Sequence, residues 1–404
     1  MKRPAKTSVA AGVAALALVL AGCGTSDGDG GGTETGTENG GFTAPDLEMM
    51  TEMGEFEGQV NILAWPGYAE DGSTDPKVDW VTPYEEATGC EANVKYFATS
   101  DEAVSLMKTG EYDVVSASGD ASLRLIASGD VEPVNTDLTE NYADVYDFLK
   151  ERDWNSVDGQ MYGVPHGYGA NLLMWRTDIV KPAPTSWGAV FEADSPYKGR
   201  ITAYDSPIYI ADAALYLMET QPDLGIENPY ALDEEQLQAA VDLLKQQREN
   251  VGEYWSDYLK EIQAFSTGDS VLGTTWQVIA NVAQSEKVPV DVVLPEEGAT
   301  GWSDTWMVSS KSENKNCAYA WLDHIVSPEA NAAVAEWFGE APANSKACEL
   351  TSPGHCESFH AGDEEYAEQI WYWTTPIEQC IDGRTDVQCT DYGRWTQAWT
   401  EVKG

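Results

Sequence analysis

Apolar and polar positions alternate along residues 59–345 in short blocks that end at glycine or proline. Runs rich in apolar and β-branched residues predict strands, and they cover residues 59–65, 93–97, 112–115 and 170–175. Segments with apolar residues three or four positions apart predict helices, and they cover residues 79–88, 101–108, 121–128 and 233–247. A further helix is expected to begin at Pro328, because Ser327 can cap it and proline suits the first helical position. Strands that alternate with short helices predict an α/β fold with a mostly parallel sheet.

Residues 1–22 have the pattern of a secretory signal peptide. Three basic residues precede an apolar run over residues 9–20, which is shorter than the roughly 20 residues of a membrane-spanning helix. The run ends in the sequence Leu-Ala-Gly-Cys at positions 20–23, the form of a lipoprotein processing site. We therefore expect a lipid on Cys23 that anchors the protein to the outer face of a bacterial cell membrane. An ordinary cleaved signal followed by an incidental cysteine is the alternative.

Residues 23–57 are expected to form a flexible tether. Residues 24–41 consist of Gly, Thr, Ser, Asp, Glu and one Asn, and such a segment cannot bury enough apolar surface to fold. Residues 44–56 form a transition that could hold a short helix. The glycine-rich run is a linker and not a phosphate loop, because no strand precedes it and no helix follows it.

The charge balance excludes one class of partner. The chain of 404 residues has 23 Lys and Arg against 68 Asp and Glu, a formal net charge of −45. A surface of this sign repels phosphate backbones, so nucleic-acid binding is not expected. It also raises the local concentration of cations near any cleft. Most of these carboxylates are expected on the solvated surface, and the charge alone does not identify a ligand.

Six cysteines remain when Cys23 is set aside, an even number that predicts three disulfides in an oxidising compartment. Pairing within each short loop gives Cys380–Cys389 and Cys348–Cys356, which leaves Cys90–Cys317, although six cysteines allow fifteen pairings. A metal site is the alternative, since His355, Cys356, Glu357 and His360 lie close together. The chain has no CxxC pair to complete such a site, and we expect no metal and no cofactor.

Ten short phrases occur in a characteristic order between residues 59 and 345. They are Ile62–Trp65 with Tyr68, Glu85–Gly89, Gly110–Val115, Tyr162–Pro165, Pro184–Trp187, Tyr197–Ile201, Trp276, Pro295–Gly298, Trp302–Asp304 and Ser327–Glu329. In these phrases the chain resembles the substrate-binding proteins of ABC importers, and within them it is similar to the spermidine/putrescine-binding branch. No single phrase is diagnostic, so the resemblance rests on their order and spacing.

The resemblance implies a two-lobe periplasmic-binding-protein fold of type II, with a ligand cleft between the lobes. Lobe 1 would contain residues 58–169 and 303–345, and lobe 2 would contain residues 170–302 and 346–404. It also implies a monomer that captures a small cationic ligand and delivers it to a membrane permease. On this partition Cys90 and Cys317 share one lobe, and both local cysteine pairs lie in the other.

A polyamine needs carboxylates at its ammonium groups and aromatic faces along its methylenes. Trp302 and Asp304 are two positions apart on an extended segment, so their side chains share one face. The resemblance makes these two residues one ring and one carboxylate of the site, and it adds Trp65, Tyr68 and Trp276 as rings and Ser118 as a polar contact. Core packing, or a surface position for the acid, is the alternative for each.

Four further positions depart from the pattern of the branch. Asp120 and Glu340 stand where an aromatic residue is usual, Asp205 keeps part of a carboxylate pair, and Tyr209 stands where an acid is expected. These changes keep the cleft acidic and move its charges. Residues 371–373, Trp-Tyr-Trp, could line the cleft, although the core of lobe 2 is the favoured place for them.

Other functions fit less well. A hydrolase is not expected, because the chain contains no Gly-x-Ser-x-Gly and the spacing from Asp304 to His324 does not match a catalytic pair. A binding protein for a quaternary ammonium compound or a basic amino acid stays open, with Arg124, Arg176 and Arg200 as the nearest cations for a ligand carboxylate. A sensor subunit without transport also stays open.

Overall fold

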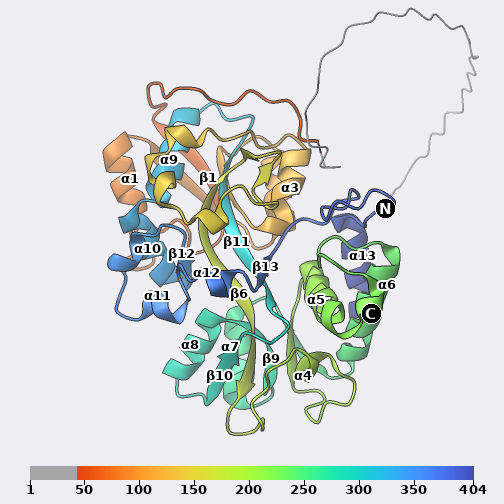
Figure 1. Ribbon diagram of the computed structural model, residues 1–404. Coiled ribbons are helices and arrows are strands. Elements are labelled where there is room, and N and C mark those ends of the chain that lie inside the picture. Colours follow the sequence, from red (N-terminus) through yellow and green to blue (C-terminus); the bar gives the residue numbers. More distant parts are fainter. Residues whose placement is uncertain (1–42) are drawn as a thin grey trace, which may run out of the picture. The chain divides into compact units, whose positions relative to one another are not determined.

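The structure, a computed structural model, describes residues 43–404 (Figure 1). Eight strands follow one hydrogen-bonded path in the order β2-β1-β3-β11-β6-β9-β7-β8. Their bounds are β1 Gln59–Ala64, β2 Glu91–Tyr96, β3 Val114–Ala117, β6 Val164–Arg176, β7 Ile201–Tyr204, β8 Val251–Trp255, β9 Leu272–Trp276 and β11 Ala299–Val308. The first three predicted strands are confirmed to within two residues at each end, and the predicted strand at 170–175 is the second part of the longer β6.

Pairing is parallel at both ends of this path and antiparallel around β6 and β11. The α/β prediction is therefore confirmed, while the mostly parallel sheet is found only in the two outer parts. The reason is that β6 and β11 are long strands that run through the middle of the sheet in opposite directions. Short-range periodicity does not report the direction of a distant partner strand.

Strand β6 changes partner along its length. Residues 164–170 pair with β11, whereas residues 171–176 pair with β9 and with β10 (Val290–Val293). This change lies next to the lobe boundary expected after residue 169. Two short strands complete this sheet, namely β12 (Ala341–Pro342) beside β6 and β13 (Ile370–Tyr372) beside β11. A separate hairpin is formed by β4 (Ser156–Val157) and β5 (Gln160–Met161).

Helices pack on both parts of the sheet (Figure 1). Those around β1–β3 are α1 Val81–Thr88, α2 Ser100–Met107, α3 Gly119–Ala127, α9 Lys315–Ile325 and α10 Pro328–Phe338. Those around β7–β9 are α4 Gly188–Phe191, α5 Ile210–Thr220, α6 Glu234–Arg248, α7 Tyr258–Thr267, α8 Gln277–Ser285 and α13 Tyr392–Lys403. The short helices α11 (His355–Ser358) and α12 (Glu364–Ala367) lie in the C-terminal segment. Single turns of 3₁₀ helix cover residues 136–138, 140–144, 147–149, 207–209, 222–224 and 347–349.

The long α6 shows how local sequence sets these elements. Asp233 accepts hydrogen bonds from the backbone N–H groups of Glu235 and Gln236, and the Gln236 side chain returns a bond to the Asp233 N–H. This capping box fixes the start of the helix that the sequence predicts. Leu237, Ala240, Val241 and Leu244 then lie buried on one side of it.

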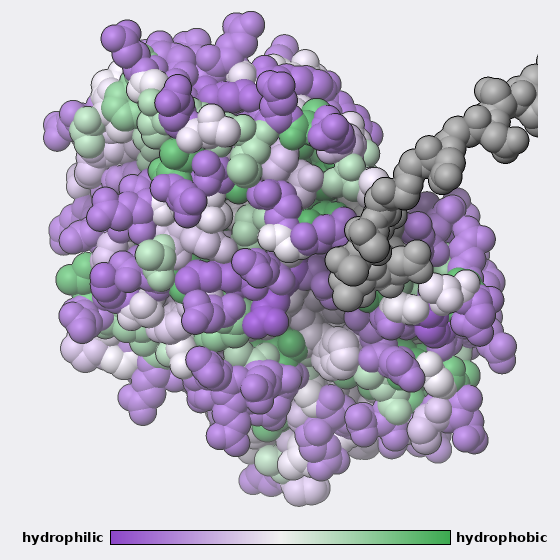
Figure 2. Space-filling model, turned by 45° about the horizontal axis from the view of Figure 1, so that its top comes forward, coloured by the Kyte–Doolittle hydropathy of each residue, from purple (hydrophilic) through white to green (hydrophobic). Residues whose placement is uncertain are grey.

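The buried side chains form separate hydrophobic clusters in the two parts of the sheet. Residues of β1, β3, α1, α9 and α10 gather around Tyr84, Trp306 and Trp321. Residues of α5, α6, α13 and β7 gather around Trp187 and Trp395. Each part therefore has its own apolar core, and polar residues cover most of the face drawn in Figure 2.

The six described cysteines form three disulfides in the pairs expected from the sequence, Cys90–Cys317, Cys348–Cys356 and Cys380–Cys389. The first joins the residue before β2 to α9 across 227 positions. Because Cys356 is oxidised, its thiolate is not free to take part in the alternative metal site. His355 Nε2 lies 2.9 Å from the main-chain oxygen of Glu340.

Residues 43–57 differ from the expected tether. They contain no helix, so the short helix considered for residues 44–56 is wrong. Ala44 and Met50 pack against two buried clusters, and the Glu57 carboxylate accepts hydrogen bonds from the N–H groups of Asn316 and Cys317. The expected signal peptide, Cys23 and the rest of the tether lie outside the described residues.

The C-terminal segment contacts both parts of the sheet. The loop closed by Cys348–Cys356 lies against α10, where the Ser352 N–H donates to Glu336. Residues 359–372 share a cluster with Tyr168 and Leu172 of β6, and α13 packs beside α6 (Figure 1). The expected assignment of residues 346–372 to lobe 2 alone does not fit these contacts. No helix within residues 43–404 is long and apolar enough to cross a membrane.

Candidate functional site

The hydroxyl group of Tyr68 lies between two buried carboxyl groups. Its oxygen is 2.9 Å from Oδ2 of Asp304 and 3.2 Å from Oε2 of Glu340. Tyr68 and Glu340 have no exposed surface, and Asp304 is 4% exposed. Residues separated by 236 and 272 positions therefore meet at one hydroxyl group.

Local sequence positions each member of this group. Tyr68 follows β1 in a turn at Gly67, whose φ of 94° favours glycine. Asp304 lies on β11. Helix α10 ends at Gly339, with φ of 86°, and Glu340 therefore leaves the helix axis and directly precedes the short β12.

His166 completes the cluster from β6. The pairing of β6 with β11 shifts between Asp304 and Thr305, which face Gly167 and Pro165, so His166 is the extra residue of a β-bulge. Its Nδ1 accepts a hydrogen bond of 2.9 Å from Trp306 Nε1. The ring proton is therefore on Nε2, which lies 3.2 Å from Oε1 of Glu340. Gly167 leaves room for Glu340, since a Cβ there would lie 2.3 Å from its carboxyl carbon.

Burial dominates the electrostatics of these groups. It raises the pKa of Asp304 to about 7, and the nearby Glu340 adds to the rise, while the Ser118 and Tyr68 hydroxyl groups and His166 oppose it. Burial, together with Asp304 and Glu340, raises the pKa of Tyr68 well above its usual range. Oδ1 of Asp304 and Oε1 of Glu340 are buried and make no hydrogen bond of standard geometry.

Aromatic rings lie on one side of the carboxyl pair. The ring centroids of Trp276 and Trp302 are 6.3 Å apart, and those of Trp302 and Phe338 are 5.9 Å apart, both in edge-to-face contact. Phe338 in turn contacts the Tyr68 ring at 4.5 Å. Gly169 permits this arrangement, because a Cβ there would lie 2.8 Å from the Trp302 ring.

A second set of rings continues from Trp276. Its Nε1 donates to Oδ1 of Asn171 at 2.9 Å, which fixes the plane of the indole. Tyr204 contacts Trp276 at 5.6 Å and stacks on Trp373 at 5.7 Å. Burial raises the pKa of Tyr204, and Asp120, Asp304 and Asp205 add to the rise. Asp212 adds to it as well, so four acids act on the Tyr204 hydroxyl group.

Trp65 and Ser118 join the group from β1 and α3. Trp65 Nε1 donates to Ser118 Oγ at 3.2 Å, and the Trp65 ring contacts Phe97 at 4.4 Å. Ser118 is the residue that precedes α3 and neighbours Asp304. These contacts link the predicted ring position to the carboxyl cluster.

Asp120 is buried near the start of α3. Oδ1 accepts from the Ser100 hydroxyl at 2.8 Å, and Oδ2 accepts from the Tyr392 hydroxyl at 3.2 Å. Burial raises its pKa, while these two hydroxyl groups and Arg124 oppose the rise. Arg124 itself pairs with Asp101 at 2.7 Å and lies over the Tyr392 ring. Asp120 therefore has partners of its own inside the protein.

Two predicted residues do not join the site. Tyr209 is 1% exposed in the core around Trp187, and its hydroxyl oxygen accepts from Gln247 Nε2. Asp205 pairs with Lys403 at 2.6 Å and accepts from Trp399 Nε1 at 3.2 Å. Lys403 of the C-terminal helix thus neutralises Asp205, and Tyr209 is part of a buried core. We therefore place neither residue among the candidate ligand contacts.

Sequence reasoning missed several members of the site. His166 and Tyr204 gave no signal of their own, because a bulge and a distant stacking partner are not visible in local spacing. Trp373 is buried in the cluster around Trp187 and Trp395, the core of lobe 2 that the sequence favoured, and there it also stacks on Tyr204. The sequence Gly-Val-Pro-His-Gly-Tyr-Gly at positions 163–169, with glycine at the alternate strand positions 167 and 169, was the available hint.

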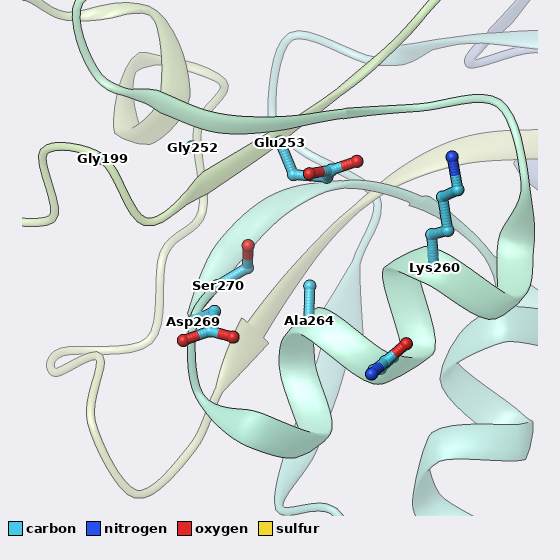
Figure 3. Close-up of a pocket in the computed structure, with 8 residues that line it drawn as sticks. Gly199, Gly252, Glu253, Lys260, Ala264, Asp269 and Ser270 are labelled. Atoms are coloured by element: carbon cyan, nitrogen blue, oxygen red, sulfur yellow. The ribbon is translucent and has the colours of Figure 1, made fainter.

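A surface pocket of about 380 Å³ lies away from these residues. It is lined by Gly199, Gly252, Glu253, Lys260, Gln263, Ala264, Asp269 and Ser270. Figure 3 shows Lys260 and Ala264 entering from α7, with Glu253, Asp269 and Ser270 around them. None of its lining residues belongs to the carboxyl cluster or to the aromatic rings.

The model of a protein family matches residues 79–354, more than half of the chain. That family is described as bacterial extracellular solute-binding protein. This chain belongs to it. The solute-binding protein is 24% identical over 274 residues to the spermidine/putrescine-binding periplasmic protein of Escherichia coli K12, which covers 67% of this chain and 75% of the relative. It is 23% identical over 299 residues to the putrescine/cadaverine-binding protein of Pseudomonas aeruginosa PAO1, covering 68% of this chain and 78% of the relative.

Solved structures show the same two-lobe fold. The spermidine/putrescine substrate-binding protein PotD of Streptococcus pneumoniae aligns with a TM-score of 0.65 at 19% identity, covering 85% of this chain and 98% of PotD. A putative spermidine/putrescine ABC transporter protein of Listeria monocytogenes aligns with a TM-score of 0.69 at 18% identity, covering 86% and 99%. The predicted two-lobe fold of the solute-binding protein is therefore confirmed.

Proposed function

We propose that this solute-binding protein captures a polyamine with primary ammonium groups, such as putrescine or spermidine, outside the cell. The observation that carries the proposal is the pair Asp304 and Glu340. Both carboxyl groups are buried, and neither has a Lys or Arg partner within residues 43–404. A buried carboxylate without a cation is costly, so the pair suits a ligand that brings positive charge.

The geometry of the pair favours a primary ammonium group. Such a group carries three N–H donors, and Oδ1 of Asp304 and Oε1 of Glu340 both lack a hydrogen bond of standard geometry. A quaternary ammonium compound has no N–H to offer them. A basic amino acid also brings a carboxylate, which the acidic cluster would repel. The rings of Trp276 and Trp302 suit the methylene chain of a polyamine.

The relatives support the same class of ligand, since the names of those compared include spermidine, putrescine and cadaverine. We propose that the ligand contacts Trp65, Tyr68, Ser118, Trp276, Trp302, Asp304 and Glu340. Asp120 is not included, because its two carboxyl oxygens accept hydrogen bonds from Ser100 and Tyr392. Lobe 1 would contain residues 58–169 and 303–345, and lobe 2 would contain residues 170–302 together with α13.

Delivery and anchoring complete the proposal. A protein of this family that works in an ABC importer presents its closed lobes to a permease, and we propose this role for a monomer that carries no catalytic chemistry. We also propose that a lipid on Cys23 holds the protein at the outer face of the cell membrane. A Cys23→Ser variant that stays attached to membranes after expression would contradict the anchor.

The ligand is tested by isothermal titration calorimetry against putrescine, spermidine, choline and arginine. The expected result is tight binding of at least one polyamine, with choline weaker by tenfold or more. Equal binding of choline and putrescine would show that N–H donors do not matter at the site. Binding of arginine alone would replace the polyamine with a basic amino acid.

A further inference from the structure

Three buried oxygen atoms meet at Tyr68, whose hydroxyl group supplies one proton for the two contacts among them. Tyr68 Oη is within hydrogen-bond distance of both Asp304 Oδ2 and Glu340 Oε2. The hydroxyl group can donate to only one of them, because it carries a single proton. An ionised carboxylate only accepts, so the second contact needs a proton on one of the two carboxyl groups.

No neighbouring group can replace that proton. His166 faces the pair, but its Nδ1 accepts from Trp306 Nε1 and its Nε2 lies 3.2 Å from Oε1 of Glu340, so its contact is with Oε1 and not with the Oε2 atom beside Tyr68. His355 of α11 contacts the main-chain oxygen of Glu340 and not its carboxyl group. From α3 and β1 the pair is faced by Ser118 and Tyr68, neither of which is a cation.

We propose that Asp304 and Glu340 share one proton in the ligand-free protein, and that a primary ammonium group binds there in exchange for that proton. Capture of the ligand then depends on pH through this shared proton. This inference rests on the proposed function, because it takes an amine as the incoming cation. The O–H bond of the carboxylic acid breaks, the proton leaves to solvent, and the N–H groups of the ammonium donate to the two carboxylates.

Two oxygen atoms of the pair can accept hydrogen bonds from the incoming ammonium group. Oδ1 of Asp304 and Oε1 of Glu340 are buried and lack donors of standard geometry in the ligand-free structure. An arriving ammonium group supplies N–H donors and a full positive charge, so both carboxyl groups can ionise together. Two carboxylates that contact the same Tyr68 hydroxyl group repel each other, which disfavours the ionisation of both without such a cation.

Calorimetry with putrescine in two buffers of different ionisation enthalpy at pH 6.5 counts the protons released. The expected result for the wild-type protein is release of close to one proton, with affinity rising up to tenfold per pH unit below neutrality. In Glu340→Gln the release is expected to fall and the pH dependence to flatten, because Asp304 loses the nearby like charge that helps it to keep a proton. Glu261→Gln is the matched control, because Glu261 is fully buried between Thr202 and Thr275 outside the cluster. Binding without proton release in the wild type would overturn the proposal.

Infrared difference spectroscopy of the ligand-free protein separates this inference from the proposed function. The wild type minus Glu340→Gln spectrum at pH 6.5 is expected to contain a carboxylic acid C=O band. The same band is expected to remain in the spectrum of the Glu261→Gln protein. Absence of that band would overturn the shared proton whatever the ligand is. If the band is present and neither putrescine nor spermidine binds at any pH, the shared proton stands and the polyamine assignment fails.

Discussion

The hydroxyl group of Tyr392 donates to the carboxylate of Asp120 over 3.2 Å, although 272 positions separate the two residues. Asp120 belongs to α3, which packs with β3, and Tyr392 begins α13, which packs with α6. The bond therefore joins two elements that belong to different hydrophobic cores. Thr375 adds a second link, since its hydroxyl donates to the Gly119 carbonyl oxygen at 2.8 Å.

Tyr392→Phe should destabilise the folded protein. The substitution keeps the ring beneath Arg124 and removes only the hydroxyl donor, so a buried oxygen of Asp120 loses a partner. The expected loss is about 1–3 kcal/mol of unfolding free energy, measured by urea denaturation of the ligand-free protein. Thr396→Val in the same helix removes a hydroxyl that bonds only to the Tyr392 carbonyl oxygen and is the control. Equal midpoints for Tyr392→Phe and wild type would contradict the role of the bond.

Asp304→Asn should weaken the capture of putrescine by tenfold or more, which is about 1.4 kcal/mol. The amide keeps the shape of the side chain and cannot carry the negative charge that an ammonium group needs. Calorimetry at pH 8 provides the measurement, because the pKa of Asp304 is raised to about 7 by burial and the wild-type carboxyl group is then largely ionised. Asp205→Asn, outside the site, should leave the dissociation constant unchanged. An unchanged constant for Asp304→Asn itself would remove this residue from the ligand contacts.

Asp212 should make the protein less stable as pH rises. Burial raises its pKa to about 8, and both of its carboxyl oxygens lack a hydrogen-bond partner of standard geometry. Since the folded state holds a proton that the unfolded state has already lost, stability falls between about pH 4 and pH 8. Asp212→Asn should therefore raise the melting temperature at pH 8.5 by more than it does at pH 5. A difference between the two proteins that is the same at both values would contradict the assignment.

The disulfides should contribute unequally to stability. Cys90–Cys317 closes a loop of 227 positions, whereas Cys380–Cys389 closes one of 9. Loop-closure entropy predicts about 5 kcal/mol for the first and about 3 kcal/mol for the second. Double alanine variants compared by urea denaturation give the order directly. A larger loss from the short loop would show that local contacts outweigh the entropy of the unfolded chain.

Much of the fold could be predicted because its signals are local. The capping residue Asp233 and the periodic apolar side of 233–247 define α6, which the structure gives as Glu234–Arg248. Pro328 begins α10 as expected. The antiparallel pairing of β6 and β11 could not be predicted, because it depends on contacts between strands about 130 positions apart.

The site was predicted in part for the same reason. Trp276 ends a predicted strand and Asp304 lies two positions from Trp302, and the structure brings the first near Trp302 and the second to Tyr68. His166 could not be found, since its side chain enters the site only through a bulge opposite Asp304 and Thr305. Tyr209 was predicted from its position in the motif, but its side chain lies in the buried core and not at the site.

The disulfide Cys380–Cys389 limits the length to which the segment between Thr375 and Tyr392 can extend. Nine chain steps could extend by roughly 30 Å, but the bridge holds their ends 5.2 Å apart at Cα. The disulfide therefore limits how far the two lobes can separate while Thr375 keeps its hydrogen bond to Gly119 of α3. Reduction of the Cys380–Cys389 disulfide would therefore let the lobes open further and raise the rate of ligand release.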